Sequence, residues 1–250
     1  MIGVFDSGVG GLSVLREILK VLPGQDYVYY ADNANCPYGE KTREFIIDRA
    51  RKITETLKDK GAEIIVVACN TATAAAISTL RKEYEIPFIG MEPAVKPAVR
   101  DTKTGVIGVL ATAGTLKAQK YIDTRERFAD NVTVVEHVGK GFVELVESGK
   151  TSGPKAEAIV ASSLKPLLDA GADTIVLGCT HYPFLADCIR KTAEQLCPGR
   201  EIEIIDPAPA VARHLLEIMD SHGIQHSAGG SVTLIASGDS SLLHSMYNCL

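Results

Sequence analysis

The sequence predicts an α/β fold with two pseudo-symmetric domains, each built around a parallel sheet. Short β-branched runs alternate with helical patterns along the whole chain, as βαβ units require. The length of 250 residues suits two domains better than one. The segment GAEIIVVACNT at 61–71 returns without a gap, 110 positions later, as GADTIVLGCTH at 171–181, and 5 of the 11 positions are identical. Each copy is an apolar run that ends in a cysteine, Cys69 or Cys179.

The first half of the chain predicts a regular series of strands and helices. A strand at 2–5 leads into the glycine-rich turn 6–11 and a helix at 12–22, where leucines recur every three or four residues. A second strand is expected at 27–31 and a long helix near 41–59. The first copy of the repeated strand follows, then a helix from Thr71 and a short strand at 86–90.

The repeat extends beyond the cysteine strand, which predicts that one half of the chain arose by duplication of the other. Residues 2–7 can be laid on residues 107–112, so that Ser7 falls on Thr112, and the motif Pro-Ala-Val at 93–95 returns at 209–211. A last strand at 231–236 and a helix from Asp239 have no counterpart in the second copy, so we expect them beside the first domain. The expected domains are therefore 1–94 with 207–250, and 95–206.

Composition and charge exclude several classes of protein. Hydrophobic residues make up 46% and charged residues 23% of the chain, as in soluble globular proteins. The net charge is −5 and no basic run exceeds Arg51-Lys52, which argues against a nucleic-acid partner. The apolar runs are far shorter than the roughly 20 residues that span a membrane, and the chain opens without a leader-like pattern, so we expect a cytoplasmic protein. A homodimer is left open.

The six cysteines are too sparse for a disulfide scaffold. The sequence contains no CxxC or CxxH pair, so we expect no metal site. Two of the thiols nevertheless occupy equivalent strand ends. In parallel sheets the carboxyl ends of the strands, with the helices that follow them, form the binding edge, and a helix N-terminus stabilises a thiolate. We expect a helix one or two residues after each of Cys69 and Cys179.

A single strand-end cysteine is usually a small buried apolar residue. The matched pair, with the polar neighbours Asn70-Thr71 and Thr180-His181, favours chemistry instead. Two readings remain open: a reversible disulfide, or proton transfer at a carbon from opposite faces in an active site between the domains. Two sulfurs alone are too few ligands for a metal.

Other polar residues lie near the same predicted sheet edges. Asp6 ends the first strand, where a buried carboxylate without a partner would be costly, so a role at the site is expected. His181 could relay a proton or lie satisfied in the core. The segment Tyr38-Gly39 after Pro37 is either a turn or a wall of the site. Glu147, by pattern, is a solvated helical residue.

Five segments in this order resemble the cofactor-independent glutamate racemases of the aspartate/glutamate racemase superfamily: DSGVGGLSV (6–14), PYG (37–39), ACNTATA (68–74), LVESG (145–149) and LGCTHYPFL (177–185). The resemblance implies that Cys69 and Cys179 are the catalytic acid/base pair, with Asp6 and His181 as helpers and Glu147 near Cys179. It implies a substrate site formed by Asp6, Ser7, Tyr38, Gly39, Asn70, Thr71, Thr180 and His181, with Thr112 and Thr115 as weaker candidates.

The resemblance also implies a biological role, the supply of D-glutamate for peptidoglycan, without pyridoxal phosphate or a metal. The alternatives are an aspartate racemase of the same superfamily and a two-domain redox or binding protein with a reversible cysteine pair. Two segments depart from the family pattern. Cys36 stands before PYG, which predicts a third thiol close to the site, and His137–Gly141 replaces a Cys-Pro pair.

Overall fold

The computed structural model describes residues 1–92, 94–225 and 230–250. It divides into two compact units, Met1–Met91 with Ala208–Leu250, and Glu92–Pro207. We call them unit 1 and unit 2. Each contains a purely parallel sheet with helices, which confirms the predicted fold class. Pro93, part of the third matching motif, lies outside the described residues.

The sheet of unit 1 has the strand order β4-β3-β1-β2-β9, and every neighbouring pair is parallel. Its central strand β1 is fully buried, as a strand covered on both faces must be. The C-terminal strand β9 pairs with β2, register Tyr27 to Val232. The strands are β1 (Ile2–Asp6), β2 (Tyr27–Ala31), β3 (Ile64–Val67), β4 (Phe88–Gly90) and β9 (Val232–Ala236).

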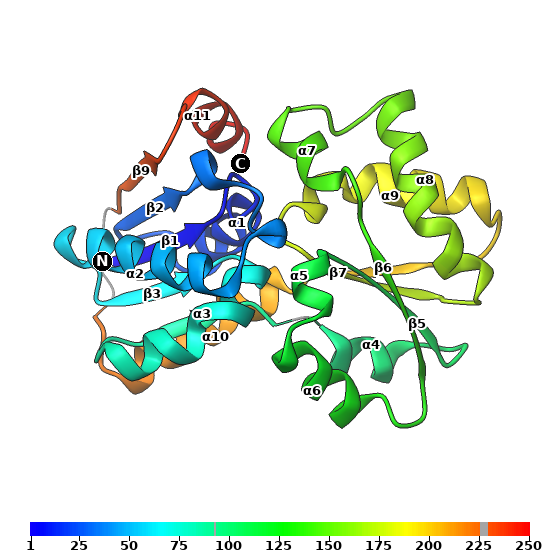
Figure 1. Cartoon of the computed structure of the whole chain (residues 1–250), viewed down its shortest axis with the longest axis horizontal. Coiled ribbons are helices and arrows are strands. Elements are labelled where there is room, and N and C mark those ends of the chain that lie inside the picture. The colour runs from blue at the N-terminus through cyan, green and yellow to red at the C-terminus, as the bar shows by residue number, and fades with distance from the viewer. Residues whose placement is uncertain (93, 226–229) are drawn as a thin grey trace. The chain divides into compact units, whose positions relative to one another are not determined.

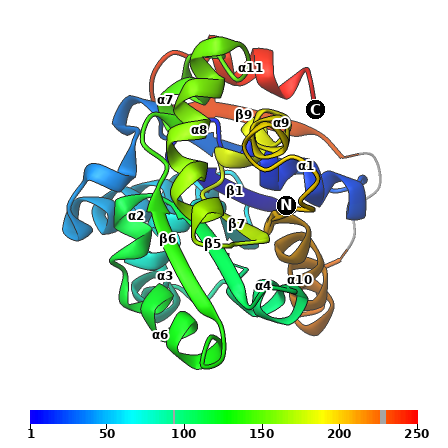
Figure 2. The same cartoon turned by 90° about the vertical axis from the view of Figure 1, so that its right-hand side faces the viewer.

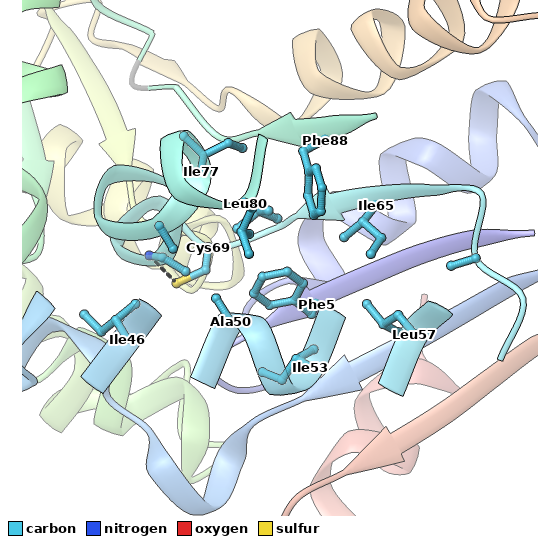
Figure 3. Close-up of a cluster of buried hydrophobic side chains, with 14 of the residues drawn as sticks. Phe5, Ile46, Ala50, Ile53, Leu57, Ile65, Cys69, Ile77, Leu80 and Phe88 are labelled. Carbon is cyan, nitrogen blue, oxygen red and sulfur yellow. Dashed lines mark hydrogen bonds between the residues drawn. The ribbon is translucent and has the colours of Figure 1, made fainter. Parts of the chain in front are cut away.

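Helices cover both faces of this sheet (Figure 1). On one face, apolar residues of α2 and α3 pack on side chains of β1 and β3 such as Phe5 and Ile65 (Figure 3). Helix α10 packs against α1, and α11 follows β9. The helices are α1 (Leu12–Val21), α2 (Arg43–Asp59), α3 (Asn70–Glu83), α10 (Ala208–Ser221) and α11 (Ser241–Tyr247).

The sheet of unit 2 has the order β6-β5-β7-β8 and is also parallel throughout. Apolar residues of α4 and α6 pack on one face of β5, while α8 lies along β5 and β6 (Figure 2). The strands are β5 (Val106–Ala111), β6 (Thr133–Val138), β7 (Thr174–Gly178) and β8 (Glu203–Ile205). The helices are α4 (Val95–Asp101), α5 (Ala113–Leu116), α6 (Gln119–Phe128), α7 (Phe142–Glu147), α8 (Pro154–Asp169) and α9 (Ala186–Leu196).

The two sheets share one topology, which supports the duplication predicted from the sequence. In each unit the first strand lies between the second and the third, and the third pairs with the fourth. Strands β1 and β3 of unit 1 therefore correspond to β5 and β7 of unit 2. Strand β9 is an addition at the outer edge of β2. Because the topologies agree, the ends of β3 and β7 are equivalent places, and each is followed at once by a cysteine, Cys69 or Cys179.

None of the helices within the described ranges is long and apolar enough to cross a membrane.

Candidate active site

Cys69 lies where β3 ends and α3 begins. It is the N-cap residue of α3, and its sulfur accepts a hydrogen bond from the Ala72 backbone N–H at 3.4 Å (Figure 3). The helix therefore starts at Asn70, one residue earlier than expected, because the cysteine itself caps it. A helix N-terminus carries partial positive charge and unpaired N–H groups. This environment favours the thiolate form of a side chain that is only 5% exposed.

Ser7 and Asp6 lie next to this thiol, at the end of β1. The Cys69 sulfur is 3.8 Å from Ser7 Oγ, and the Ser7 hydroxyl is 3.4 Å from Asp6 Oδ1. The other carboxylate oxygen, Asp6 Oδ2, accepts the Gly11 backbone N–H at 2.6 Å. A Cβ on Gly11 would lie 2.7 Å from Asp6 Cβ and 2.7 Å from the Tyr29 hydroxyl, so only glycine allows this approach.

The structure therefore gives Asp6 a partner that the sequence argument did not foresee. Asp6 is completely buried, and the amide at the start of α1 compensates part of the cost of burying its charge. Its burial alone is thus not evidence of a role in the reaction. Its position, one hydrogen bond from Ser7, still connects it to the thiol.

Asn70 and Thr71 occupy the first turn of α3 and are buried. Both polar atoms of the Asn70 amide, Oδ1 and Nδ2, are buried and have no hydrogen-bond partner among the described residues. A buried amide normally finds partners, and leaving one unsatisfied costs about 1–3 kcal/mol. The Asn70 amide therefore has a donor and an acceptor available for a polar group of a ligand.

Tyr38 is held by a network that the sequence analysis missed. Its hydroxyl donates to Asp32, a fully buried carboxylate that directly follows β2. Arg49 of α2 binds the same carboxylate in a bidentate way, with nitrogen to oxygen distances of 2.7 and 2.9 Å. Asn35 Nδ2 donates to it at 3.0 Å. Asp32 could have been found by the same rule as Asp6, since both are acidic residues at the carboxyl end of a buried strand.

This network perturbs the ionisation of its members. Burial and the hydrogen bond to Asp32 raise the pKa of Tyr38 far above its usual value, so the phenol stays neutral. Burial acts to raise the pKa of Asp32, but Arg49, Tyr38, Asn35 and Ser237 outweigh it, and the net shift is downward. Gly39 lies beside Tyr38 in a short 3₁₀ turn, and Cys36 is half-buried just before Pro37.

Cys179 has a different environment from Cys69. After β7 the chain makes a turn, then the short 3₁₀ helix η3 (Tyr182–Leu185), and α9 begins only at Ala186. The expectation of a helix one or two residues after this cysteine is therefore wrong. The neighbour of the Cys179 sulfur is instead His181 Nδ1, at 3.8 Å.

His181 connects this thiol to an acidic residue. Its Nε2 lies 2.6 Å from Glu147 Oε1, at the end of α7. His181 is 2% exposed and the Glu147 side chain 21% exposed. Glu147 is helical, as its pattern predicts, but the description of it as solvated is wrong, because the helical pattern could not show that it faces a histidine 34 positions later.

The remaining candidates of unit 2 lie at the same sheet edge. Thr112, the counterpart of Ser7, directly follows β5 and caps α5 by accepting the Thr115 backbone N–H at 3.2 Å. The hydroxyls of Thr112 and Thr115 are 3.0 Å apart. Thr180 is buried beside Cys179.

Each unit thus carries one buried thiol with a partner suited to proton chemistry. In unit 1 the partners are a helix N-terminus and a hydroxyl, and in unit 2 an imidazole backed by a carboxylate. All six cysteines are free thiols. The arrangement suits general acid/base chemistry by sulfur.

The chain belongs to the Asp/Glu/hydantoin racemase family, whose family model matches residues 2–215. It is therefore an amino-acid racemase, an isomerase. Glutamate racemase from Stutzerimonas stutzeri (strain A1501) is 48% identical over 95% of this chain and 89% of its own. A crystal structure of a glutamate racemase from Bacillus anthracis has a TM-score of 0.88 and 33% identity, covering 100% of this chain and 92% of that one.

A second solved structure includes a ligand. Escherichia coli glutamate racemase in complex with L-glutamate and the activator UDP-MurNAc-ala has a TM-score of 0.84 and 32% identity, covering 99% of this chain and 94% of that one.

Proposed function

We propose that this chain interconverts L- and D-glutamate by moving a proton at the α-carbon, with Cys69 and Cys179 as the two acid/base groups. The observation that carries the proposal is the pair of buried thiols at equivalent ends of β3 and β7. Its relatives are named glutamate racemases, and one of them binds L-glutamate, which supports this substrate.

In the proposed reaction one cysteine starts as a thiolate and the other as a thiol. The thiolate takes the α-proton, and the electron pair of the broken C–H bond stays on the carbon. The opposite thiol then gives its proton to the other face of that carbon. The configuration is inverted, the two sulfurs have exchanged protonation states, and no electrons are gained or lost. Neither pyridoxal phosphate nor a metal is needed for this balance.

The neighbours of each thiol receive roles in this proposal. Asp6 and Ser7 support Cys69, because they form a chain of polar contacts that ends at its sulfur. His181 supports Cys179, because its imidazole is next to that sulfur and can exchange a proton with it. Glu147 holds His181 by its other nitrogen and fixes the direction of the ring.

The substrate would be held by polar groups next to the two thiols. Asn70 is the strongest candidate, because its buried amide has no partner within the described residues and a carboxylate or ammonium group would satisfy it. The other proposed binding residues are Asp6, Ser7, Tyr38, Gly39, Thr71, Thr112, Thr115, Thr180 and His181. In a bacterial cell the product D-glutamate would serve peptidoglycan synthesis, and we propose that the enzyme works in the cytoplasm.

Solvent exchange tests the reaction directly. The wild-type protein is incubated in D₂O with L-glutamate or D-glutamate, and the α-proton signal is followed by NMR together with the enantiomer ratio. We expect deuterium at the α-position of both enantiomers and convergence on a racemic mixture. No exchange with either enantiomer would remove the proposal.

Two alternatives are separated by further measurements. The same assay with both enantiomers of aspartate tests the substrate, since one methylene is worth about 1–3 kcal/mol of discrimination in a pocket. Glutamate should be the faster substrate, and faster exchange of aspartate would reverse the assignment. A redox protein would show no exchange, and mass spectrometry after mild oxidation would find Cys69 joined to Cys179.

A further inference from the structure

Tyr182 is a fully buried residue that the proposed reaction does not use, although it directly follows His181. Its backbone N–H donates to the Cys179 carbonyl at 3.1 Å, so it closes the turn that carries the thiol. Its ring packs edge-on against Phe142, with the ring centroids 4.9 Å apart and the planes at 62°. Phe142 is the first residue of α7 and is also completely buried.

Helix α7 therefore contacts the Cys179 turn at two points. Phe142 packs on Tyr182 at one end of the helix, and Glu147 binds His181 at the other end. A helix of only six residues is not stable by itself and takes its position from packing. The direction of the Glu147 carboxylate then depends on the aromatic contact one and a half turns away.

Gly139 shows how closely the ring of Tyr182 is enclosed. A Cβ on Gly139 would lie 2.6 Å from the tyrosine oxygen and 2.8 Å from ring atom Cζ, closer than real Cβ contacts. The Tyr182 hydroxyl donates to the Gly139 carbonyl, but at 3.4 Å this hydrogen bond is long. Shape therefore holds the ring more than the hydrogen bond does.

We propose that Tyr182 is a positioning residue, which holds α7 against the Cys179 turn so that Glu147 keeps its hydrogen bond to His181. The expected effect of Tyr182 on racemase kinetics rests on the proposed function. Its expected effect on the His181–Glu147 contact and on the reactivity of Cys179 does not. Burial, the nearby Cys179 and Glu144 raise the pKa of Tyr182 well above its usual value, so its ring stays neutral and serves as a packing element.

The test uses the substrate-free protein, so that it does not depend on racemase activity. The rate at which iodoacetamide alkylates Cys179 is measured across the pH range by peptide mass spectrometry, with the Cys69 peptide as internal reference. The Glu147→Gln variant replaces the carboxylate that binds His181 Nε2 with a neutral amide. This change should slow Cys179 alkylation at neutral pH several-fold. Tyr182→Leu, which removes the aromatic contact, should produce the same change, whereas Tyr182→Phe should remain near wild type.

Two further variants sharpen the result. Gly139→Ala should mimic Tyr182→Leu by pushing on the ring, and the added Tyr182→Phe change should restore part of the loss, because the nearest clashing atom is then gone. Tyr121→Leu is the matched control. Tyr121 is an equally buried tyrosine of unit 2, but its hydroxyl binds Glu136, and its loss should destabilise the unit without altering Cys179 alkylation.

Double variants distinguish positioning from general loosening. If Tyr182 acts through Glu147, then Tyr182→Leu with Glu147→Gln should be no slower than Glu147→Gln alone. Additive effects, or a Cys179 profile unchanged in both Tyr182→Leu and Gly139→Ala, would overturn the proposal. Circular dichroism checks that each variant is folded. If Tyr182→Leu is unfolded, the proposal is tested by comparing Gly139→Ala with the double variant Gly139→Ala, Tyr182→Phe. In the racemase assay kcat should fall more than KM rises, and absence of racemisation in the wild type would refute only the proposed function.

Discussion

The two half-sites share a strand end and a thiol, but they surround the sulfur differently. Cys69 caps a fourteen-residue helix and contacts a serine, so its sulfur faces fixed backbone and hydroxyl dipoles. Cys179 is followed by a turn and a short 3₁₀ helix, and its neighbour is a titratable imidazole. The matching topology of the two sheets places the two thiols at equivalent positions, whereas the residues that follow them differ.

The different surroundings of Cys69 and Cys179 imply different ways of stabilising the reactive thiolate form. A helix N-terminus stabilises a thiolate at any pH at which the helix is folded, whereas a histidine does so according to its own protonation. L- and D-glutamate have equal free energies in water, so kcat/KM must be the same for both directions of racemisation. Asymmetry between the half-sites must therefore appear in kcat and KM separately and in the reactivity of each thiol. We expect Cys69 and Cys179 to differ in reactivity and to act as the base toward opposite enantiomers.

The largest effect should come from removing either sulfur. Cys69→Ala and Cys179→Ala should each lower kcat for both enantiomers by at least the roughly 10²–10⁴-fold that a positioned acid or base contributes. Both variants should fold, because alanine keeps most of the small buried side chain. Chiral chromatography of the products measures the rate, and Cys188→Ala is a control with a buried cysteine of unit 2 on α9. A Cys179→Ala protein that racemises at the wild-type rate would remove the two-thiol reaction.

A smaller effect should separate the partners of the two thiols. His181→Asn should lower kcat roughly a hundredfold, because Cys179 loses the group that exchanges its proton. Ser7→Ala should cost less, since the Ala72 backbone N–H still faces the Cys69 sulfur. Peptide-resolved alkylation rates across the pH range measure each thiol separately, and each variant should alter only the thiol beside it. Equal changes at both cysteines in either variant would contradict independent half-sites.

The exposed His214, on α10, serves as the histidine control. His214→Asn should leave the kinetics of both enantiomers unchanged.

The comparison of the half-sites also shows what the sequence could predict. Periodicity and the repeated strand predicted both sheets and the two thiols, because these features follow from local patterns of residue type. The partner of each thiol depends on how the chain turns after the strand. His181 reaches Cys179 only because no α-helix starts there, and Glu147 reaches His181 through the packing of α7. The Arg49 contact with Asp32, from α2, likewise depends on tertiary packing that residue spacing does not encode.

The smallest predicted effect compares a carboxylate beside the Cys69 half-site with one remote from the chemistry of unit 2. Asp32 binds Tyr38 and Arg49, whereas Asp173 lies just before β7, at the opposite end of that strand from Cys179. Asp173 accepts the Thr102 hydroxyl at 2.6 Å and the Lys103 and Thr104 backbone N–H groups at 2.7 and 2.8 Å. Burial acts to raise the pKa of Asp173, but these bonds outweigh it, so the pKa is lowered, as for Asp32.

Asp32→Asn and Asp173→Asn should each reduce the free energy of unfolding by about 1.5–3 kcal/mol at neutral pH, as measured by urea denaturation. Because both folded pKa values lie below the unfolded value of about 3.9, the stabilisation is complete above that pH. It is lost as the pH falls through the lower folded pKa, so the gap between wild type and each variant should close under acid. Only Asp32→Asn should also raise KM for glutamate a few-fold, because only Asp32 holds Tyr38. An equal rise in KM for Asp173→Asn would show that KM responds to a general loss of protein stability, and not to the contact between Asp32 and Tyr38.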